Sequence, residues 1–348
     1  MWVGNVAIGG NAPIAVQSMS KIPATEIKKA IRQIKEIEEA GCDIIRIAVP
    51  DLKTAQAIKV IKKEILIPIV ADIHFNYRLA IEAIRSGADK IRLNPGNIYR
   101  PEEVLAVIQE AKKKKIPVRI GVNSGSLNTV TSYQLPVTSL NLPQRMVEKT
   151  LNYLKIFEKM KFKDIVISLK TSDVFSTIES YELLAKKVDY PFHLGVTASG
   201  PVVPALVKSS LGIGTLLMDG IGDTIRVSLT SDPVNEVRAG HEILKSLGLK
   251  KGIDIISCPT CGRCRVNLVK MVNDFERSLC LDPRYNLYPG VKVALMGCEV
   301  NGPGEARDAD VGVAFGKKDA LFFKKGKPIK KINQKEVITT LLKNIRMA

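Results

Sequence analysis

Residues 14–49 read IAVQSMSKIPATEIKKAIRQIKEIEEAGCDIIRIAV, and this stretch decides the fold. It begins and ends with short β-rich runs, 14–19 and 43–49. Between these runs, apolar residues recur at three- and four-residue steps from Ile27 to Ile37, which is the spacing of an amphipathic helix. The stretch therefore predicts a strand, a helix and a second strand, in that order.

The same unit repeats along the chain until about residue 247. The predicted strands are 14–19, 43–49, 67–71, 90–94, 118–122, 164–169, 192–197 and 224–229. Strands that alternate with helices predict parallel pairing with right-handed crossovers, and eight such units favour closure into a barrel. A doubly wound open sheet is the alternative, but no G-x-G-x-x-G follows the first strand. We therefore expect an α/β fold with a TIM (β/α)8 barrel over residues 1–248.

After Lys250 the alternation of strands and helices changes. Short strands near 253–256, 291–296 and 311–315, with helices near 266–278 and 334–345, predict a small α+β domain. Glycines flank Leu249-Lys250-Lys251, which suits an exposed linker between the two domains. We expect this second domain to occupy residues 249–348.

The composition limits the class of protein. Of 348 residues, 45% are hydrophobic and 25% are charged, which argues against wholesale disorder. The formal net charge is +17, so nucleic acid, phosphorylated metabolites and acidic proteins are all candidate partners. Aromatic residues make up only 5%, which weakens an interpretation based on stacked nucleic-acid bases. We expect no nucleic-acid partner.

Residues 1–20 carry no basic start of the kind that a secretory signal has, and a hairpin turn is expected at residues 9–11. Elsewhere the apolar runs are shorter than the ~20 residues that a membrane helix needs. These features predict a cytoplasmic protein without a membrane partner. In that compartment, cysteine pairs favour metal or redox roles over structural disulfides.

Polar side chains collect at the carboxyl ends of the predicted strands, where barrels of this kind carry their sites. They are Gln17, Ser18, Arg46, Asp72, His74, Arg92, Asn94, Arg119, Asn123, Ser168, Lys170, Thr197, Arg226 and Ser228. Four arginines and one lysine at a single mouth would repel one another unless an anion lay between them. Arginine offers a planar fork of donors to phosphate oxygens, so a shared phosphate ligand is favoured. The alternative is that each arginine pairs with an acidic residue on the barrel rim.

Two segments hold four of the six cysteines: residues 257–264, SCPTCGRC, and 297–305, GCEVNGPGE. Zinc is the poorer fit because the second segment has a single cysteine and no histidine. The first three spacings match a bacterial ferredoxin cluster, but the fourth position is Leu268. Two ligand sets therefore remain: four cysteines that include Cys264, or three cysteines with a carboxylate. Cys42 and Cys280 are expected to be ordinary buried thiols.

Six motifs resemble the family of 4-hydroxy-3-methylbut-2-en-1-yl diphosphate synthases. They are QSM at 17–19, ADIHF at 71–75, NPGNI at 94–98, RIGVN at 119–123, SCPTC at 257–261 and NGPGE at 301–305. The resemblance covers nearly the whole chain, and the two cysteine segments together are highly specific. It implies a TIM barrel followed by an iron–sulfur domain, in a homodimer where the cluster domain of one subunit caps the barrel of the other.

The resemblance also implies a reaction in isoprenoid biosynthesis. The substrate would be 2-C-methyl-D-erythritol 2,4-cyclodiphosphate, opened and dehydroxylated with two electrons to give 4-hydroxy-3-methylbut-2-enyl diphosphate. The electrons would come from an acidic carrier, reduced ferredoxin or flavodoxin, which could dock on the lysines between residues 317 and 331. Two other functions remain open. One is a basic nucleic-acid- or phosphate-binding barrel with structural zinc, and the other is a pterin or phosphosugar enzyme with an appended electron-transfer module.

Carried onto this sequence, the ligands of a [4Fe-4S] cluster fall on Cys258, Cys261, Cys298 and Glu305, and Cys264 is left over as a nearby thiol. The substrate-binding positions fall on Arg46, Arg92, Asn94, Arg119, Asn123, Lys170, Thr197, Arg226 and Ser228. The catalytic positions fall on Glu305, Asn301, Asp72 and His74. Two positions depart from the family, because residues 195–200 read GVTASG where many relatives read GVTEAG, and the departure at residue 198 matters for the mechanism. Ala198 thus lacks the carboxylate proposed to assist at the substrate hydroxyl.

Overall fold

The computed structural model describes residues 1–127, 140–280, 290–300, 304 and 306–345. The chain divides into two compact units, Met1–Leu249 and Lys250–Ala348. Each unit has a hydrophobic core of its own. They are described separately below.

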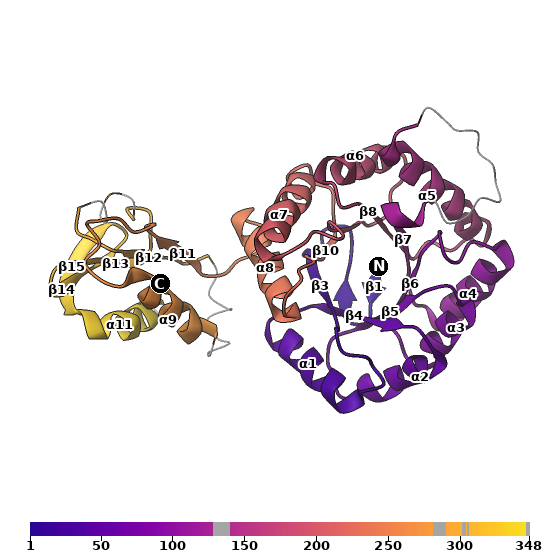
Figure 1. Cartoon of the computed structure of the whole chain (residues 1–348), viewed down its shortest axis with the longest axis horizontal. Helices are drawn as coiled ribbons and strands as arrows, with labels where there is room; N and C mark the ends of the chain where they lie inside the picture. Colours follow the sequence, from indigo (N-terminus) through magenta and orange to yellow (C-terminus); the bar gives the residue numbers. More distant parts are fainter. Residues whose placement is uncertain (128–139, 281–289, 301–303, 305, 346–348) are drawn as a thin grey trace. The chain divides into compact units, whose positions relative to one another are not determined.

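The first unit is a parallel barrel (Figure 1). Its strands are β3 (Ala15–Met19), β4 (Ile44–Val49), β5 (Ile69–Ile73), β6 (Lys90–Leu93), β7 (Val118–Asn123), β8 (Ile165–Lys170), β9 (His193–Leu194) and β10 (Thr224–Ile225). They follow the order β8-β7-β6-β5-β4-β3-β10-β9. A parallel bridge between Ile167 and Phe192 joins the two end strands and closes the ring. The prediction of a TIM-like barrel is therefore confirmed.

A ring of helices surrounds the strands (Figure 1). It consists of α1 (Ile27–Glu39), α2 (Leu52–Ile61), α3 (Tyr77–Arg85), α4 (Pro101–Lys114), α5 (Leu142–Lys159), α6 (Val174–Ala185), α7 (Val202–Met218) and α8 (Pro233–Ser246), and the short turn η1 is Ser124–Ser126. The helix predicted from Ile27 buries Ala30, Ile34 and Ile37. These side chains join Ile45 and Ile47 of β4 in the main core. The outward face of each strand is thus held by helices, which leaves the inward face for the site.

A hairpin of β1 (Trp2–Val3) and β2 (Val6–Ala7) belongs to a small apolar cluster with the first inward residues of the barrel. Val3 and Ile8 pack there with Ala15, Ile44 and Val70. A turn is present at residues 9–11 as predicted, with the Ala12 amide donating to the Gly9 carbonyl at 3.4 Å. It is not the hairpin turn, because the paired strands β1 and β2 are joined through Gly4 and Asn5. Gly4 has a φ of +56°, which glycine adopts at little cost.

Two barrel strands are much shorter than predicted. The expected strands 192–197 and 224–229 become two-residue strands, and the chain leaves the ladder at Gly195 and Arg226. Gly195 has a φ of +156°, and Ala198 lies in the left-handed region at +50°. The ends of these strands are therefore irregular backbone, as is common beside functional sites.

The second unit is a five-stranded sheet covered by helices. Its strands are β11 (Asp254–Ser257), β12 (Lys292–Met296), β13 (Val311–Phe315), β14 (Asp319–Lys324) and β15 (Lys327–Asn333); its helices are α9 (Leu268–Cys280), the short η3 (Gln334–Glu336) and α11 (Val337–Ile345). Strands β11, β12 and β13 pair in parallel, and the last three pair antiparallel. Sequence analysis missed β14, in which Ala320, Phe322 and Phe323 are buried, and β15, whose three lysines accompany a single buried residue, Ile332.

Candidate functional site

The barrel mouth gathers the charged residues that the sequence placed at strand ends. Each strand from β4 to β8 carries one charged residue of the site, at a position that faces the barrel interior. In strand order these residues are Arg46, Asp72, Arg92, Arg119 and Lys170. Arg226 directly follows β10. Side chains of Asp72, Arg92, Arg119 and Lys170 are almost fully buried, and those of Arg46 and Arg226 are 14% exposed. The structure therefore brings all five predicted cations together with one predicted carboxylate.

The Asp72 carboxylate contacts three basic side chains: Arg46, Arg92 and His74. Its Oδ1 lies 3.1 Å from Arg92 Nη1, and its Oδ2 lies 3.4 Å from Arg46 Nη2 and 3.2 Å from His74 Nε2. Burial alone would raise the pKa of Asp72, but Arg46, His74 and Arg92 together hold it well below the usual range. Asp72 is therefore an ionised acceptor at neutral pH, and it positions two arginines.

A second carboxylate, Glu236 of α8, balances the opposite side of the mouth. Its Oε2 lies 3.5 Å from Arg226 Nη2 and accepts from the Ser18 hydroxyl at 3.2 Å. Its Oε1 lies 3.3 Å from Lys21 Nζ. Glu236 is 1% exposed, although it lies in the first turn of a helix. Sequence analysis missed this residue because it looks like an ordinary acidic residue at a helix start, where such residues are common.

Arg119 and Lys170 have no carboxylate partner among the described residues. Burial first, and then the charges of Arg46 and Arg92, hold the pKa of Arg119 well below its usual value. Burial and the charge of Arg119 do the same to Lys170, whose Nζ donates to the Leu194 carbonyl at 3.4 Å. Both cations would be stabilised by an anion in the mouth.

Two glycines make room for the cationic side chains. A Cβ atom at Gly121 would lie 2.6 Å from Arg92 Nε, and one at Gly195 would lie 2.6 Å from Lys170 Nζ. Arg92 also donates from Nη2 to the Gly121 carbonyl at 2.9 Å. Because Gly121 of β7 and Gly195 after β9 have no side chains, Arg92 and Lys170 can cross the barrel interior.

The segment after β6 builds the rim beside His74. Asn94 Oδ1 accepts from the Gly96 amide at 3.0 Å and from the Ser126 hydroxyl at 3.1 Å. Asn97 Nδ2 lies 3.1 Å from His74 Nδ1, so the imidazole is fixed from both sides. The NPGN motif thus shapes the turn that holds a predicted catalytic residue.

The other predicted rim residues lie around this mouth at the ends of their strands. Asn123 ends β7, Thr197 and Ser228 lie beyond β9 and β10, and all three are half-buried. The Thr197 amide donates to the Thr171 carbonyl at 2.9 Å, which ties the segment before Ala198 to the loop after β8. Ala198 is exposed, and Ser199 donates from its hydroxyl to the Val196 carbonyl at 3.2 Å.

Sequence analysis also missed two buried residues deeper in the barrel, Lys90 and His193. Both are fully buried and inward-facing: Lys90 lies two residues before Arg92, and His193 lies two before Gly195. The two-residue periodicity of a strand would have indicated both. Strand-end reasoning overlooked them because they lie at the beginnings of β6 and β9.

The cysteine segments lie at the carboxyl ends of two neighbouring parallel strands of the second unit. Cys258 follows β11 and Cys298 follows β12, and the Gly297 amide donates to Cys258 Sγ at 3.3 Å. A Cβ at Gly297 would lie 2.5 Å from Cys264 Sγ and 3.4 Å from Cys258 Sγ. These two thiols therefore share the space beside Gly297, whereas Cys261 is exposed.

Glu305 and Asn301 lie outside the described residues, and so does the side chain of Cys280. Within the described part of the chain, no three Cys, His, Asp or Glu side chains are grouped closely enough to hold a metal ion. The donor chemistry nevertheless fits iron and sulfide, because soft thiols flank a side-chain-free glycine at adjacent strand ends. Cys42 is buried as predicted, and burial raises its thiol pKa to about 12.

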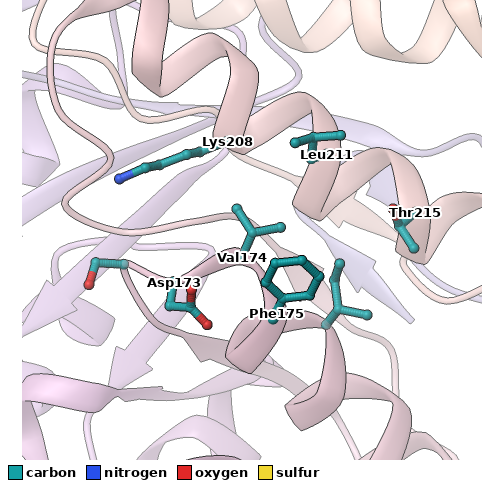
Figure 2. A pocket seen from close by; sticks show the side chains of 8 residues that line it. Asp173, Val174, Phe175, Lys208, Leu211 and Thr215 are labelled. Atoms are coloured by element: carbon teal, nitrogen blue, oxygen red, sulfur yellow. The ribbon is translucent and has the colours of Figure 1, made fainter.

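A separate hollow of about 390 Å³ lies between α6 and α7, outside the mouth (Figure 2). Phe175 and Leu211 give it apolar walls, with Asp173 and Lys208 at its edge. The Asp173 carboxylate is already used, since it accepts from the Ser176 amide at 2.7 Å as the cap of α6. This hollow has no convergent set of polar groups, so the mouth is the better candidate site. Within the described residues, no helix combines the length and apolar character needed to cross a bilayer.

The fold and the site define the class as an α/β-barrel protein with a cationic mouth and an appended cysteine-bearing unit. The chain belongs to the GcpE family: the GcpE TIM-barrel domain matches residues 1–241, and the GcpE protein C-terminal domain matches residues 254–347.

Curated relatives agree with this assignment. A relative from Caldanaerobacter subterraneus subsp. tengcongensis is 52% identical over 99% of this chain and 95% of its own length. Another from Thermodesulfovibrio yellowstonii is 51% identical over 99% and 97%. Both are named 4-hydroxy-3-methylbut-2-en-1-yl diphosphate synthase (flavodoxin).

Among solved structures, dihydropteroate synthase from Stenotrophomonas maltophilia matches with a TM-score of 0.51 and 14% identity. The match covers 68% of this chain and 92% of that one, and it shows the barrel fold alone. The family assignment does not support the alternative of a nucleic-acid-binding protein with structural zinc.

Proposed function

We propose that this chain is an iron–sulfur oxidoreductase of isoprenoid biosynthesis. It would convert 2-C-methyl-D-erythritol 2,4-cyclodiphosphate to 4-hydroxy-3-methylbut-2-enyl diphosphate, the product in the names of its curated relatives. The observation that carries the proposal is the barrel mouth, where five buried or nearly buried cations share the carboxylates Asp72 and Glu236 among the described residues. A cyclic diphosphate supplies the negative charge that this arrangement lacks.

The mouth residues would bind and orient the diphosphate before any bond breaks. Arg119 and Lys170, which lack carboxylate partners in the described chain, would contact the phosphate oxygens directly. Arg46 and Arg92 are already held by Asp72 within 3.4 Å, so they would need little reorganisation as charge develops on the leaving oxygen. Asn94, Asn123, Thr197, Arg226 and Ser228 would complete the hydrogen bonds around the substrate.

Asp72 and His74 would act next to the reacting carbons. The low pKa of Asp72 makes it a poor proton donor, so its proposed role is to hold Arg46, Arg92 and His74 in place. His74 is 41% exposed at the rim and is fixed by Asp72 and Asn97, so it can approach a substrate hydroxyl. His74 is therefore the better candidate to deliver the proton with which the C3 hydroxyl leaves as water, once that hydroxyl replaces Asp72 as the acceptor of the Nε2 hydrogen.

Four residues would hold a [4Fe-4S] cluster: Cys258, Cys261, Cys298 and Glu305. Asn301 would lie between the cluster and the substrate. When bound, the cluster supplies the two electrons of the reaction one at a time. The GcpE C-terminal domain match spans all five residues. The three free thiols described among them are the soft ligands that iron favours.

The partners follow from the same proposal. Flavodoxin is the proposed electron carrier, because the curated relatives bear its name, and the exposed lysines of β15 offer an acidic protein a complementary surface. We also propose a homodimer in the cytoplasm, where the reducing environment keeps thiols free.

The test is turnover by the full-length chain, purified and reconstituted without oxygen. With reduced flavodoxin, we expect consumption of the cyclic diphosphate and an optical spectrum of the [4Fe-4S] type. Arg119→Met should retain that spectrum and lose at least 100-fold in kcat/KM, whereas the exposed Lys59→Met should match the unmodified chain. A colourless zinc protein, or a clustered protein that leaves this substrate unchanged, would refute the proposal.

A further inference from the structure

The barrel interior also contains a group of buried polar side chains, of which the proposed reaction uses Arg119 alone. Gln17, Arg119 and His193 face inward from β3, β7 and β9, which are alternate strands, as expected of side chains in one barrel layer. Lys90 lies on β6, paired in register with Val70 of β5. These four polar side chains are at most 1% exposed.

Their polar atoms lack hydrogen-bond partners among the described residues. The atoms concerned are both amide atoms of Gln17, Lys90 Nζ, Arg119 Nε and Nη1, and His193 Nε2. Burial lowers the pKa of His193, and the charges of Arg119 and Lys90 lower it further. These three groups are therefore near one another, and Gln17 faces the same interior from β3. Buried polar groups without partners are rare in folded proteins, and they indicate a bound water or ion.

The charges of these side chains favour a bound anion over a bound water. Lys90 and Arg119 are both cations, and neither makes an ion pair with any carboxylate in the described chain. The Thr224 hydroxyl, 2.7 Å from His193 Nδ1, can donate to that nitrogen, which leaves Nε2 to carry the imidazole proton as a donor. With the Gln17 amide, the group thus offers N–H donors from four side chains and two positive charges.

The neighbouring side chains are apolar on one side of this group and cationic on the other. On the side of the β1–β2 hairpin, Ala15, Ile44 and Val70 pack in an apolar cluster, and Val70 pairs with Lys90. On the other side, Arg92 crosses the barrel beside Gly121. An ion of the size of chloride needs about the volume of one water molecule.

We propose that Gln17, Lys90, Arg119 and His193 form a buried site for a chloride-sized inorganic anion beneath the substrate mouth. The anion offsets the charges of Lys90 and Arg119 in the resting protein and fixes Arg119 from below. Burial and the charge of Arg119 lower the pKa of Lys90 to about 7, and a neighbouring anion favours the protonated form of this amine. The site does not involve the cysteine segments, and it shares Arg119 with the proposed substrate mouth.

The test uses crystals of the full-length chain grown without chloride and soaked in bromide, which is located by its anomalous scattering. We expect a bromide peak within hydrogen-bond distance of Lys90 Nζ, in addition to any peak in the mouth. Lys90→Met should lose the deep peak, and the surface control Lys59→Met should retain it. Bromide in the mouth alone, or an ordered water at Lys90 under the same soak, would overturn the proposal.

A solution measurement keeps the test decisive if Lys90→Met does not crystallise. At equal ionic strength, chloride should raise the Tm of the unmodified chain and of Lys59→Met relative to gluconate, because a ligand that binds only the folded state stabilises it. The rise should be smaller in Lys90→Met. That variant should also be at least as stable as the unmodified chain without chloride, since it removes a buried unpaired charge. An equal chloride effect in all three proteins would refute the site.

Discussion

Asp72 is the carboxylate through which Arg46, Arg92 and His74 are held together, so its charge should matter for folding as well as for substrate binding. Its replacement by Asn leaves two buried arginines without their counter-charge, which should cost about 3–5 kcal/mol of unfolding free energy at pH 7. Urea unfolding of Asp72→Asn and of the exposed control Glu39→Gln measures this cost. Equal stability of the two variants would contradict the role given to Asp72.

The same residue predicts how stability depends on pH. The folded-state pKa of Asp72 is lowered well below its unfolded value of about 3.9. The stabilisation is therefore complete above about pH 5 and is lost as the pH falls through the folded-state value. Unfolding curves between pH 3 and 6 should show a steeper loss of stability for the unmodified chain than for Asp72→Asn. Parallel curves would mean that Asp72 does not titrate with unfolding.

Cys264 distinguishes the two ligand sets that the cysteine spacing leaves open, and Cys298, which belongs to both sets, serves as the control. Cys264 lies beside Gly297 and Cys258, so proximity alone would permit it as a ligand. The assignment with Glu305 predicts that Cys264→Ser retains its iron and acid-labile sulfide after anaerobic reconstitution, whereas Cys298→Ser loses them. Chemical analysis of both variants decides between the two sets. Loss of iron from Cys264→Ser would support four thiolates instead.

At the scale of elements, β7 must lack a side chain at Gly121 for Arg92 to reach Asp72. A methyl group there would lie 2.6 Å from Arg92 Nε and 3.2 Å from Ser168 Oγ, so the guanidinium must move. Because displacement of a binding group by about 1 Å can cost about 100-fold in rate, Gly121→Ala should lower kcat/KM by about that factor. Gly214→Ala in α7, where a Cβ meets no atom within 4 Å, is the matched control. Equal kinetics for both variants would show that Arg92 does not position the substrate.

Elements with a clear apolar period could be predicted from the sequence, and those set by tertiary contacts could not. The strand beginning at residue 118 and helix α1 follow directly from their patterns. Strand β5 is shifted two residues beyond its predicted range, to Ile69–Ile73, because Pro68 precedes it and has no amide hydrogen to donate. Strand β15 was missed because it is an edge strand with a single buried residue, Ile332.

The sequence predicts those residues of the site that lie near the carboxyl ends of the predicted strands. Lys170 and Arg226 lie at or just beyond the carboxyl end of a strand, where parallel barrels place their sites, and Arg92 lies one residue before such an end. Arg46 and Arg119 lie earlier, at the third position of β4 and the second of β7, and reach the same interior because they face inward. Glu236 comes from a helix, and Lys90 and His193 come from the starts of strands, so that rule could not find them. Their importance depends on burial and on missing partners, which only the folded chain reveals.

At the scale of the whole molecule, the positively charged residues lie in two different environments. The mouth cations are buried and share few carboxylates, whereas the lysines of β15 lie on an exposed edge strand. Lysines on an edge strand also prevent pairing with other chains, which gives them a structural reason besides carrier docking. Net charge of +17 therefore does not by itself indicate nucleic acid.

The division of the chain into a barrel unit and a cysteine-bearing unit permits a direct test of the proposed homodimer. If the active site combines the barrel of one subunit with the cysteine unit of its partner, two inactive variants should complement each other. Arg119→Met disables the barrel, and Cys258→Ser disables the other unit. A dimer that contains one chain of each kind then has one intact combination, since the unmodified barrel meets the unmodified cysteine unit only across the interface.

Mixing the two variants under subunit exchange should therefore restore about a quarter of the unmodified activity, because half of the dimers are mixed and each has one working site. Each variant mixed with itself should stay inactive, which controls for recovery during reconstitution. Activity is measured as consumption of the cyclic diphosphate with reduced flavodoxin, and size-exclusion chromatography confirms that the mixed species is a dimer. No recovery in a verified mixed dimer would show that each chain builds its site from its own two units.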